Sequence, residues 1–106
     1  MSYRFMRVVI FFDLPMESSL DIREYTRFRK FMIRNGFLMI QKSVYTKLAL
    51  NPTTANAIMD NIKKHKPAKG LVQMLCITEK QFSKMEFVVG EFEATVLDST
   101  DRVVFL

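Results

Sequence analysis

The sequence is poor in the residues on which many enzyme chemistries depend. Its 106 residues include one cysteine, one histidine, three glycines and no tryptophan. A lone cysteine, Cys76, excludes an internal disulfide and fits a reducing compartment. Zinc is excluded by ligand count, and no glycine-rich phosphate loop is present. No nucleophile motif accompanies the histidine, His65, which we interpret as a surface residue.

Long apolar runs are also missing. No stretch approaches the ~18 apolar residues that a membrane span requires, and the N-terminus lacks the cleavage pattern of a signal peptide. We therefore expect a cytoplasmic protein with no membrane partner. A chain of 106 residues is predicted to form a single domain, 1–106, which buries about 65% of its unfolded surface.

Apolar and basic residues, by contrast, are abundant. The sequence is 49% apolar and contains ten Phe and eight Met, which predicts a folded chain with a rich core. Sixteen Lys and Arg against eleven Asp and Glu give a net charge of +5. This excess favours anionic partners, nucleic acid first.

The segment Met6–Asp13 organises the rest of the chain. It is almost wholly apolar, which is typical of a strand buried on both faces at the centre of a sheet. Pro15 ends the strand near Asp13 and leaves a carboxylate at the edge of the sheet. Two interpretations of Asp13 are open. It can cap the following turn or helix, which the strand alone favours, or it can be a metal-binding or catalytic carboxylate.

A helix is predicted from the N-cap candidates in Met16–Ser19 to about Asn35–Gly36. At 100° per residue, one face of this helix is apolar and the opposite face is basic. The apolar stripe consists of Ile22, Tyr25, Phe28 and Met32. The basic stripe consists of Arg23, Arg27, Lys30 and Arg34. It is either an ordinary solvated face or, because four cations stand in line, a surface for a phosphate backbone.

Four further strands and two helices follow. The strands are predicted at Phe37–Thr46, Leu71–Ile77, Phe87–Gly90 and Arg102–Leu106. One helix begins at Asn51–Pro52 and ends in the lysines around His65, and a short helix opens at the capping box Thr78–Gln81. Cys76 lies in an apolar run and is predicted to be inert core.

With a strand-length loop between the strand Phe37–Thr46 and the helix that begins at Asn51–Pro52, this order predicts an α+β fold, a ferredoxin-like βαββαβ sandwich with a fifth strand appended at the C-terminus. Two helices would cover one face of a four-stranded antiparallel sheet. The other face would need cover, which a homodimer with stacked sheets supplies. The last strand would add to a sheet, and we expect it to be the partner's.

Within this fold, two nucleic-acid chemistries can be compared. An RNA-recognition module would carry exposed aromatics on its third strand, and Leu71–Ile77 has none. A magnesium site remains open, because Mg²⁺ can be held by one or two carboxylates and water. In a two-fold dimer the second Asp13 would complete a shared Mg²⁺ site that activates water or polarises a phosphodiester.

Taken together, the motifs of the chain resemble those of the CRISPR-associated protein 2 family. The version most similar is that of the type II-A systems of Gram-positive bacteria. The strand-end Asp13 and the Gln-x-Ser-Val motif within Gln41–Tyr45 carry the likeness, in this order along the chain. The other matching segments are Phe5–Pro15, Tyr25–Phe31, Gly36–Phe37, Thr78–Phe82 and Arg102–Leu106.

The resemblance implies a homodimer whose last strand crosses to the partner's sheet. It also implies a role in CRISPR adaptation, in which the dimer lies between two dimers of the CRISPR-associated integrase, protein 1, and holds foreign duplex DNA. Asp13 matches the family's strand-end aspartate, which in some members coordinates Mg²⁺ to cleave RNA or DNA. DNA contact by the basic stripe is our own inference from the residues.

Three functions therefore compete. A scaffold needs a dimer and a salt-sensitive phosphate surface. An endonuclease needs the Asp13 pair and a divalent ion. A ferredoxin-like regulator that senses a small molecule fits the fold but not the charge. We favour the scaffold, because the sequence offers one candidate catalytic carboxylate per chain and no general acid, and hydrolysis usually needs more catalytic groups.

Overall fold

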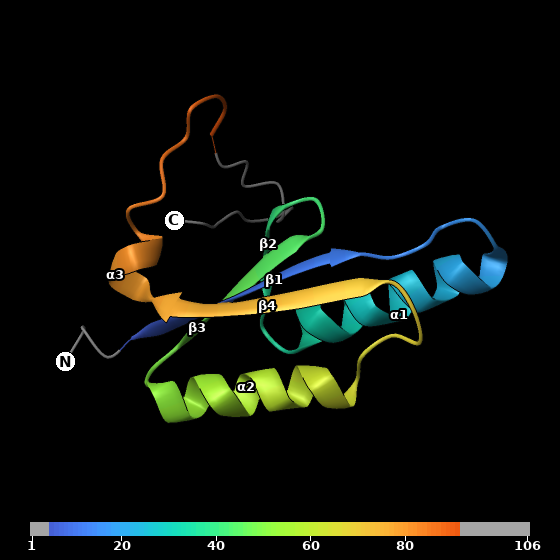
Figure 1. Cartoon of the computed structure of the whole chain (residues 1–106), viewed down its shortest axis with the longest axis horizontal. Coiled ribbons are helices and arrows are strands. Elements are labelled where there is room, and N and C mark those ends of the chain that lie inside the picture. Colours follow the sequence, from blue (N-terminus) through green and yellow to red (C-terminus); the bar gives the residue numbers. More distant parts are fainter. Residues whose placement is uncertain (1–4, 92–106) are drawn as a thin grey trace.

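A computed structural model describes residues 5–91 of the chain (Figure 1). Its elements are β1 (Met6–Asp13), α1 (Ser19–Arg34), β2 (Leu38–Gln41), β3 (Val44–Ala49), α2 (Pro52–Lys64), β4 (Leu71–Thr78) and α3 (Glu79–Phe82). The first six follow the βαββαβ order, which confirms the predicted ferredoxin-like α+β sandwich. Within the described residues, no helix is long and apolar enough to cross a membrane.

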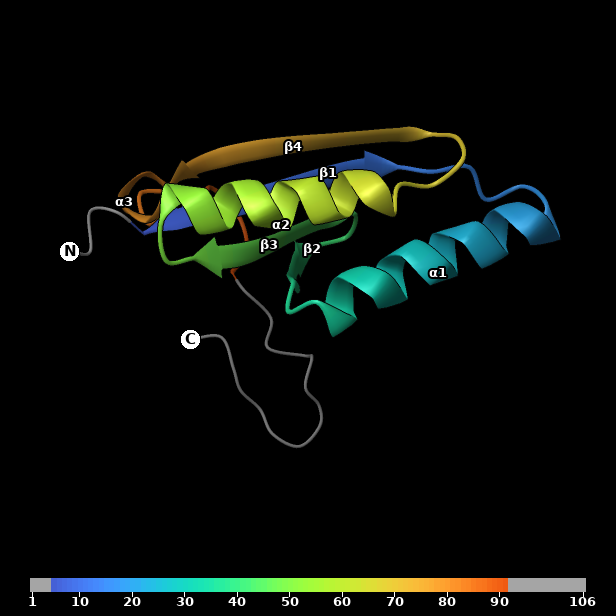
Figure 2. The ribbon, with the colours of Figure 1, turned by 90° about the horizontal axis from the view of Figure 1, so that it is seen from below.

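The four strands form one antiparallel sheet in the order β2-β3-β1-β4. Helices α1 and α2 both lie on one face of this sheet (Figures 1 and 2). Strand β1 is an inner strand, as its apolar sequence predicts, and Val8, Val9 and Ile10 are buried. Phe11 is the exception, because 38% of it is exposed on the face that carries no helix.

The core lies between the sheet and the two helices. Alternate residues of β1, namely Val8, Ile10 and Phe12, pack there against Phe28 of α1 and Ile62 of α2. The Phe12 ring meets the Phe28 ring edge-on, with 5.5 Å between centroids. This arrangement sets the end of β1 firmly in place. The predicted apolar stripe of α1 is confirmed at Phe28 and Met32, which are fully buried, but Ile22 is 47% exposed.

The prediction of one strand over Phe37–Thr46 is wrong. The segment is a hairpin of β2 and β3, with its turn at Lys42–Ser43. Ser43 has a φ of 66°, a left-handed conformation that serine seldom adopts. The turn lacks the Asn-Gly or Asp-Gly pair that usually marks a tight hairpin. For that reason the sequence pattern predicted one continuous strand where the structure has two.

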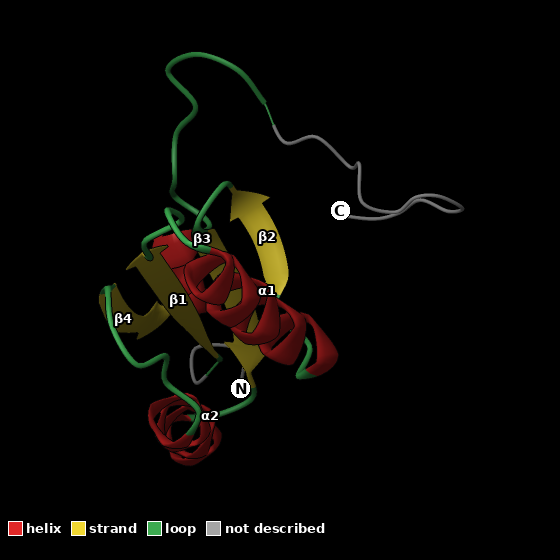
Figure 3. Cartoon of the chain, turned by 90° about the vertical axis from the view of Figure 1, so that its right-hand side faces the viewer, coloured by secondary structure: helices red, strands yellow, loops and turns green. Residues whose placement is uncertain are grey.

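The predicted strand Phe87–Gly90 is also wrong. These residues form a loop (Figure 3), and Val88 and Val89 are 93% and 89% exposed. A β-branched run favours a strand, but this preference depends on the packing of the side chains, and the valines here are exposed. The predicted final strand, Arg102–Leu106, lies outside the described residues.

The face of the sheet opposite α1 and α2, here called the open face, carries exposed apolar side chains. The strand register aligns Val9 of β1 with Thr46 of β3 and Leu75 of β4, and so defines the residues of this face. Its exposed members are Phe11, Leu38, Leu48, Leu71 and Leu75. Several exposed apolar side chains on one face of a sheet favour an interaction site. Within residues 5–91, these side chains therefore remain to be covered, as the sequence predicted for this face.

Candidate functional site

Asp13 is the last residue of β1, where its side chain is exposed and its backbone is closely held. Its register partner is Leu71 of β4. Gly70 packs against the same point: a Cβ there would lie 3.0 Å from the Asp13 carbonyl oxygen and 2.7 Å from Leu14 Cδ2. The carboxylate thus projects into solvent from a rigid backbone.

The capping interpretation of Asp13 is wrong, because Ser18 caps α1. The Ser18 hydroxyl accepts a hydrogen bond from the Asp21 backbone N–H at 3.0 Å, and the Asp21 carboxylate accepts one from the Ser18 N–H at 3.2 Å. Among the residues that the structure describes, none forms a hydrogen bond or ion pair with the Asp13 carboxylate. The Asp13 carboxylate therefore makes no hydrogen bond or ion pair within residues 5–91.

The described residues contain no complete set of metal ligands around Asp13. Within residues 5–91, no three Asp, Glu, His or Cys side chains lie together as ligands would. Asp13 can donate a carboxylate oxygen, the ligand type that Mg²⁺ prefers. Among the described residues, Asp13 is thus a single candidate ligand for Mg²⁺, whose other positions water can fill.

Asp21 was not predicted from the sequence, although the spacing Ser-x-x-Asp signals a capping box. It is only 8% exposed, and its Oδ1 lies 3.6 Å from the Lys69 Nζ. Hydrogen bonding to Ser18 lowers the pKa of Asp21 despite the opposing effect of burial, and the charge of Lys69 lowers this pKa further. The carboxylate therefore belongs to the helix start and is not available for chemistry.

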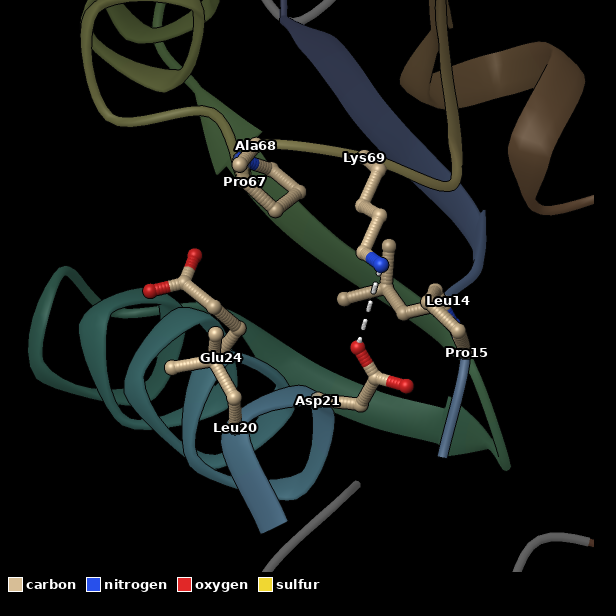
Figure 4. A pocket seen from close by; sticks show the side chains of 8 residues that line it. All are labelled: Leu14, Pro15, Leu20, Asp21, Glu24, Pro67, Ala68 and Lys69. Carbon is tan, nitrogen blue, oxygen red and sulfur yellow. Dashed lines mark ion pairs between the residues drawn. The ribbon is translucent and has the colours of Figure 1, made fainter. Parts of the chain in front are cut away.

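A small pocket opens beside this capping box (Figure 4). Its apolar walls are Leu14, Pro15, Leu20, Pro67 and Ala68, and Asp21, Glu24 and Lys69 complete its lining. The cavity volume is about 60 Å³, far below the ~300 Å³ or more of typical small-molecule sites. This pocket does not favour the interpretation as a small-molecule regulator.

The basic stripe lies along α1 with all four side chains exposed. Arg27 is already engaged: its guanidinium pairs with Glu24 at 3.2 Å and donates to the His65 carbonyl oxygen at 3.4 Å. The Arg27 hydrogen bond and charge lower the pKa of Glu24. In the described part of the chain, no acidic side chain pairs with Arg23, Lys30 or Arg34. Three of the four cations in the stripe are therefore unneutralised.

Many protein families share the ferredoxin-like fold, and comparison with known families shows to which of them this chain belongs. Residues 6–85 match the family model of CRISPR associated protein Cas2. The chain belongs to the Cas2 family. Its predicted resemblance is thus confirmed, and the match spans all of the secondary structure described above.

Curated relatives agree with this membership over nearly the full chain. The CRISPR-associated endoribonuclease Cas2 of Treponema denticola is 48% identical over 101 residues, covering 95% of this chain and 100% of that protein. The protein of the same name from Ligilactobacillus salivarius is 43% identical, with the same coverage of both chains. That of Streptococcus mutans is 40% identical, covering 95% of this chain and 93% of the relative.

A solved structure described as the crystal structure of cas2 has the same fold. It superposes with a TM-score of 0.57 at 15% sequence identity, covering 94% of this chain and 99% of the other. At that identity the likeness concerns the fold alone. The Cas2 fold here thus rests on two independent comparisons, of sequence and of structure.

Proposed function

We propose that this Cas2-family chain acts in CRISPR adaptation, in the cytoplasm, as a homodimeric scaffold that holds foreign duplex DNA between dimers of the CRISPR-associated integrase. The observation that carries the proposal is the line of exposed cations on α1, of which Arg23, Lys30 and Arg34 have no acidic partner in the described chain. Such a line suits a phosphate backbone, whose contacts position a duplex without reading its sequence.

The open face supports the homodimer. Exposed leucines on β3 and β4 would be covered by stacking the sheets of two copies about a two-fold axis, because a two-fold interface uses the same patch twice. Two copies would also place two basic stripes on one particle. A dimer of this kind would give the duplex a longer track than a single helix offers.

The scaffold is tested with the variant R23A/K30A, which spares Arg27 because that residue connects α1 to α2. Binding of a fluorescent duplex is measured by anisotropy over a series of salt concentrations. We expect weaker binding to any sequence and a salt dependence whose log–log slope falls by about 0.9 for each phosphate that the variant no longer neutralises. An unchanged slope would show that the basic stripe is only a solvated face.

A second candidate function is a Mg²⁺-dependent endonuclease that cleaves RNA or DNA through paired Asp13 residues. The free, exposed Asp13 carboxylate favours it, as do the names of the relatives, which describe endoribonucleases. When bound, the metal would supply Lewis-acid and water-activating chemistry. The chain's own part would be to hold two carboxylates at rigid strand ends.

Asp13→Asn separates the two functions, because the exchange removes the charge from an exposed side chain and leaves the fold intact. RNA and duplex DNA cleavage are measured with Mg²⁺ and with a chelator, and spacer acquisition is measured in cells. Acquisition that persists in the variant supports the scaffold. Acquisition that disappears while the dimer and the integrase complex survive moves the nuclease to the front.

A further inference from the structure

The positive charge of the chain is concentrated in one region. Residues 19–69 contain eleven Lys and Arg against three Asp and Glu, whereas residues 70–106 contain three against six. The first region comprises α1, the β2–β3 hairpin, α2 and the loop that leads to β4. The positive electrostatic potential around α1 and α2 is therefore stronger than the net charge of +5 for the whole chain suggests.

Direct contacts join the middle of α1 to the end of α2. Arg27 donates to the His65 carbonyl oxygen at 3.4 Å, and the rings of Phe31 and His65 stack with 4.3 Å between centroids at 23°. His65 is the C-cap of α2, and its ring Nδ1 lies 2.9 Å from the Asn61 carbonyl oxygen. These contacts hold the C-terminal end of α2 beside the basic stripe of α1. Figure 2 shows both helices on the same side of the sheet.

Lysines flank His65 on both sides at this junction. Lys63, Lys64 and Lys66 are all exposed. Lys63 approaches Asp60 at 4.0 Å, whereas no described acidic side chain pairs with Lys64 or Lys66. Complementing the α2 dipole explains cations in the last helical turn. The dipole does not explain Lys66, which lies beyond the end of α2. Nor does it explain why His65, between these lysines, contacts a second basic helix, α1.

We propose that Lys64 and Lys66 extend the phosphate-binding surface of the basic stripe, so that a duplex backbone crosses from α1 onto the end of α2. This inference rests on the proposed function. Arg23 to Arg34 spans about 16 Å along α1, by the rise of 1.5 Å per residue. That length matches roughly five nucleotides of one strand. Lys64 and Lys66 would add phosphate contacts beside the basic stripe, where the curved DNA backbone would continue.

The test compares three double variants that each remove two positive charges: K64A/K66A, R23A/K30A and K80A/K84A. The last is the matched control, because Lys80 and Lys84 are exposed and belong to the α3 region (Figure 1). Thermal melting first confirms that each variant is folded. Anisotropy with a fluorescent duplex then gives the dissociation constant and its salt slope for each protein.

We expect K64A/K66A to weaken duplex binding and to lower the log–log salt slope by about 0.9 for each phosphate no longer neutralised, with the control unchanged. A wild-type slope for K64A/K66A, together with a lowered slope for R23A/K30A, would overturn this extension and leave the scaffold intact. Wild-type slopes for both would overturn the DNA surface of the proposed function as well. Equal weakening in all three variants, control included, would also overturn it, because binding would then follow net charge alone.

Discussion

At the scale of single residues, Asp13 and Asp21 are two nearby carboxylates with different surroundings. Asp21 is buried among hydrogen-bond donors at the start of α1, whereas Asp13 has no partner in the described chain. Burial with satisfied hydrogen bonds indicates a structural acid. An exposed acid at a strand end with no partner among the described residues is, by contrast, a candidate for function.

Asp21 makes a prediction about pH. Its folded pKa is lowered, so its contribution to stability is present above the ordinary value of 3.8 and is lost as the pH falls through the folded pKa. We expect the free energy of unfolding of the wild type to fall more steeply below about pH 4 than that of Asp21→Asn. Denaturant unfolding at several pH values measures this. Parallel pH profiles for the two proteins would contradict it.

Gly70 makes a second prediction at this scale. Its φ is +98°, and an added Cβ would meet Leu14 Cδ2 at 2.7 Å, so Gly70→Ala is expected to lower the free energy of unfolding by roughly 2 kcal/mol and to displace the end of β1. Gly90→Ala is the matched control, because its φ is +89° but nothing lies within 4 Å. Equal destabilisation in denaturant unfolding would show that the crowding at Asp13 is unimportant.

At the scale of elements, α3 is held against the sheet by one side chain of β1. Arg7 forms a bidentate ion pair with Glu79 at 2.8 and 2.6 Å, and its guanidinium lies 4.5 Å from the centre of the Phe82 ring. Arg7 is 14% exposed, so this pair is shielded better than the exposed Arg27–Glu24 pair. Arg7, a charged residue in a mostly apolar strand, thereby has a structural role.

A double-mutant cycle tests this attachment. With Arg7→Ala and Glu79→Ala, singly and together, we expect a coupling energy of about 1–2 kcal/mol, since charge-assisted bidentate pairs are the stronger kind. The same cycle on Arg27 and Glu24 should give no more than about 0.5 kcal/mol, as is usual for exposed helix pairs. Equal coupling in the two cycles would contradict the claim that shielding strengthens the Arg7–Glu79 pair.

At the scale of the whole molecule, the described helices α1 and α2 cover one face of the sheet. The helices bury one face of the sheet, and the open face leaves Leu48 and Leu75 at 40% and 49% exposed. The proposed dimer would bury these leucines. Its two-fold axis would also relate the two Asp13 carboxylates, so that dimer geometry decides whether they can share an ion.

Lysine substitutions on the open face test the dimer. We expect Leu48→Lys/Leu75→Lys to give a monomer by light scattering, because burying two unpaired ammonium groups is very costly. Leu50→Lys is the matched control, since Leu50 is 62% exposed and lies in the connection between β3 and α2. A dimer that persists in the double variant would exclude this face as the interface.

The sequence alone was sufficient for the features that depend on neighbours along the chain. The apolar run of β1, the stop at Pro15, the Asn51–Pro52 helix start and the Thr78–Gln81 capping box all lie where they were predicted. These signals are local: a cap or a hydrophobic period acts within a few residues. Their order along the chain indicated an α+β sandwich, with which the family motifs agreed, although the second and third strands of the βαββαβ plan were predicted as one strand, Phe37–Thr46.

Tertiary structure decided what depends on partners distant in sequence. Ser43 forms a turn inside a segment that was predicted to be one strand, and Phe87–Gly90 is a loop and not a strand. Arg27, one of the four cations of the predicted basic stripe, is engaged by Glu24 and by the end of α2. Strand pairing and helix packing join residues that lie dozens of positions apart in the sequence. Which side chains find a hydrogen-bond or ion-pair partner therefore depends on the folded structure and not on the neighbouring residues. By the same physics Asp13, Arg23, Lys30 and Arg34 are left available for partners.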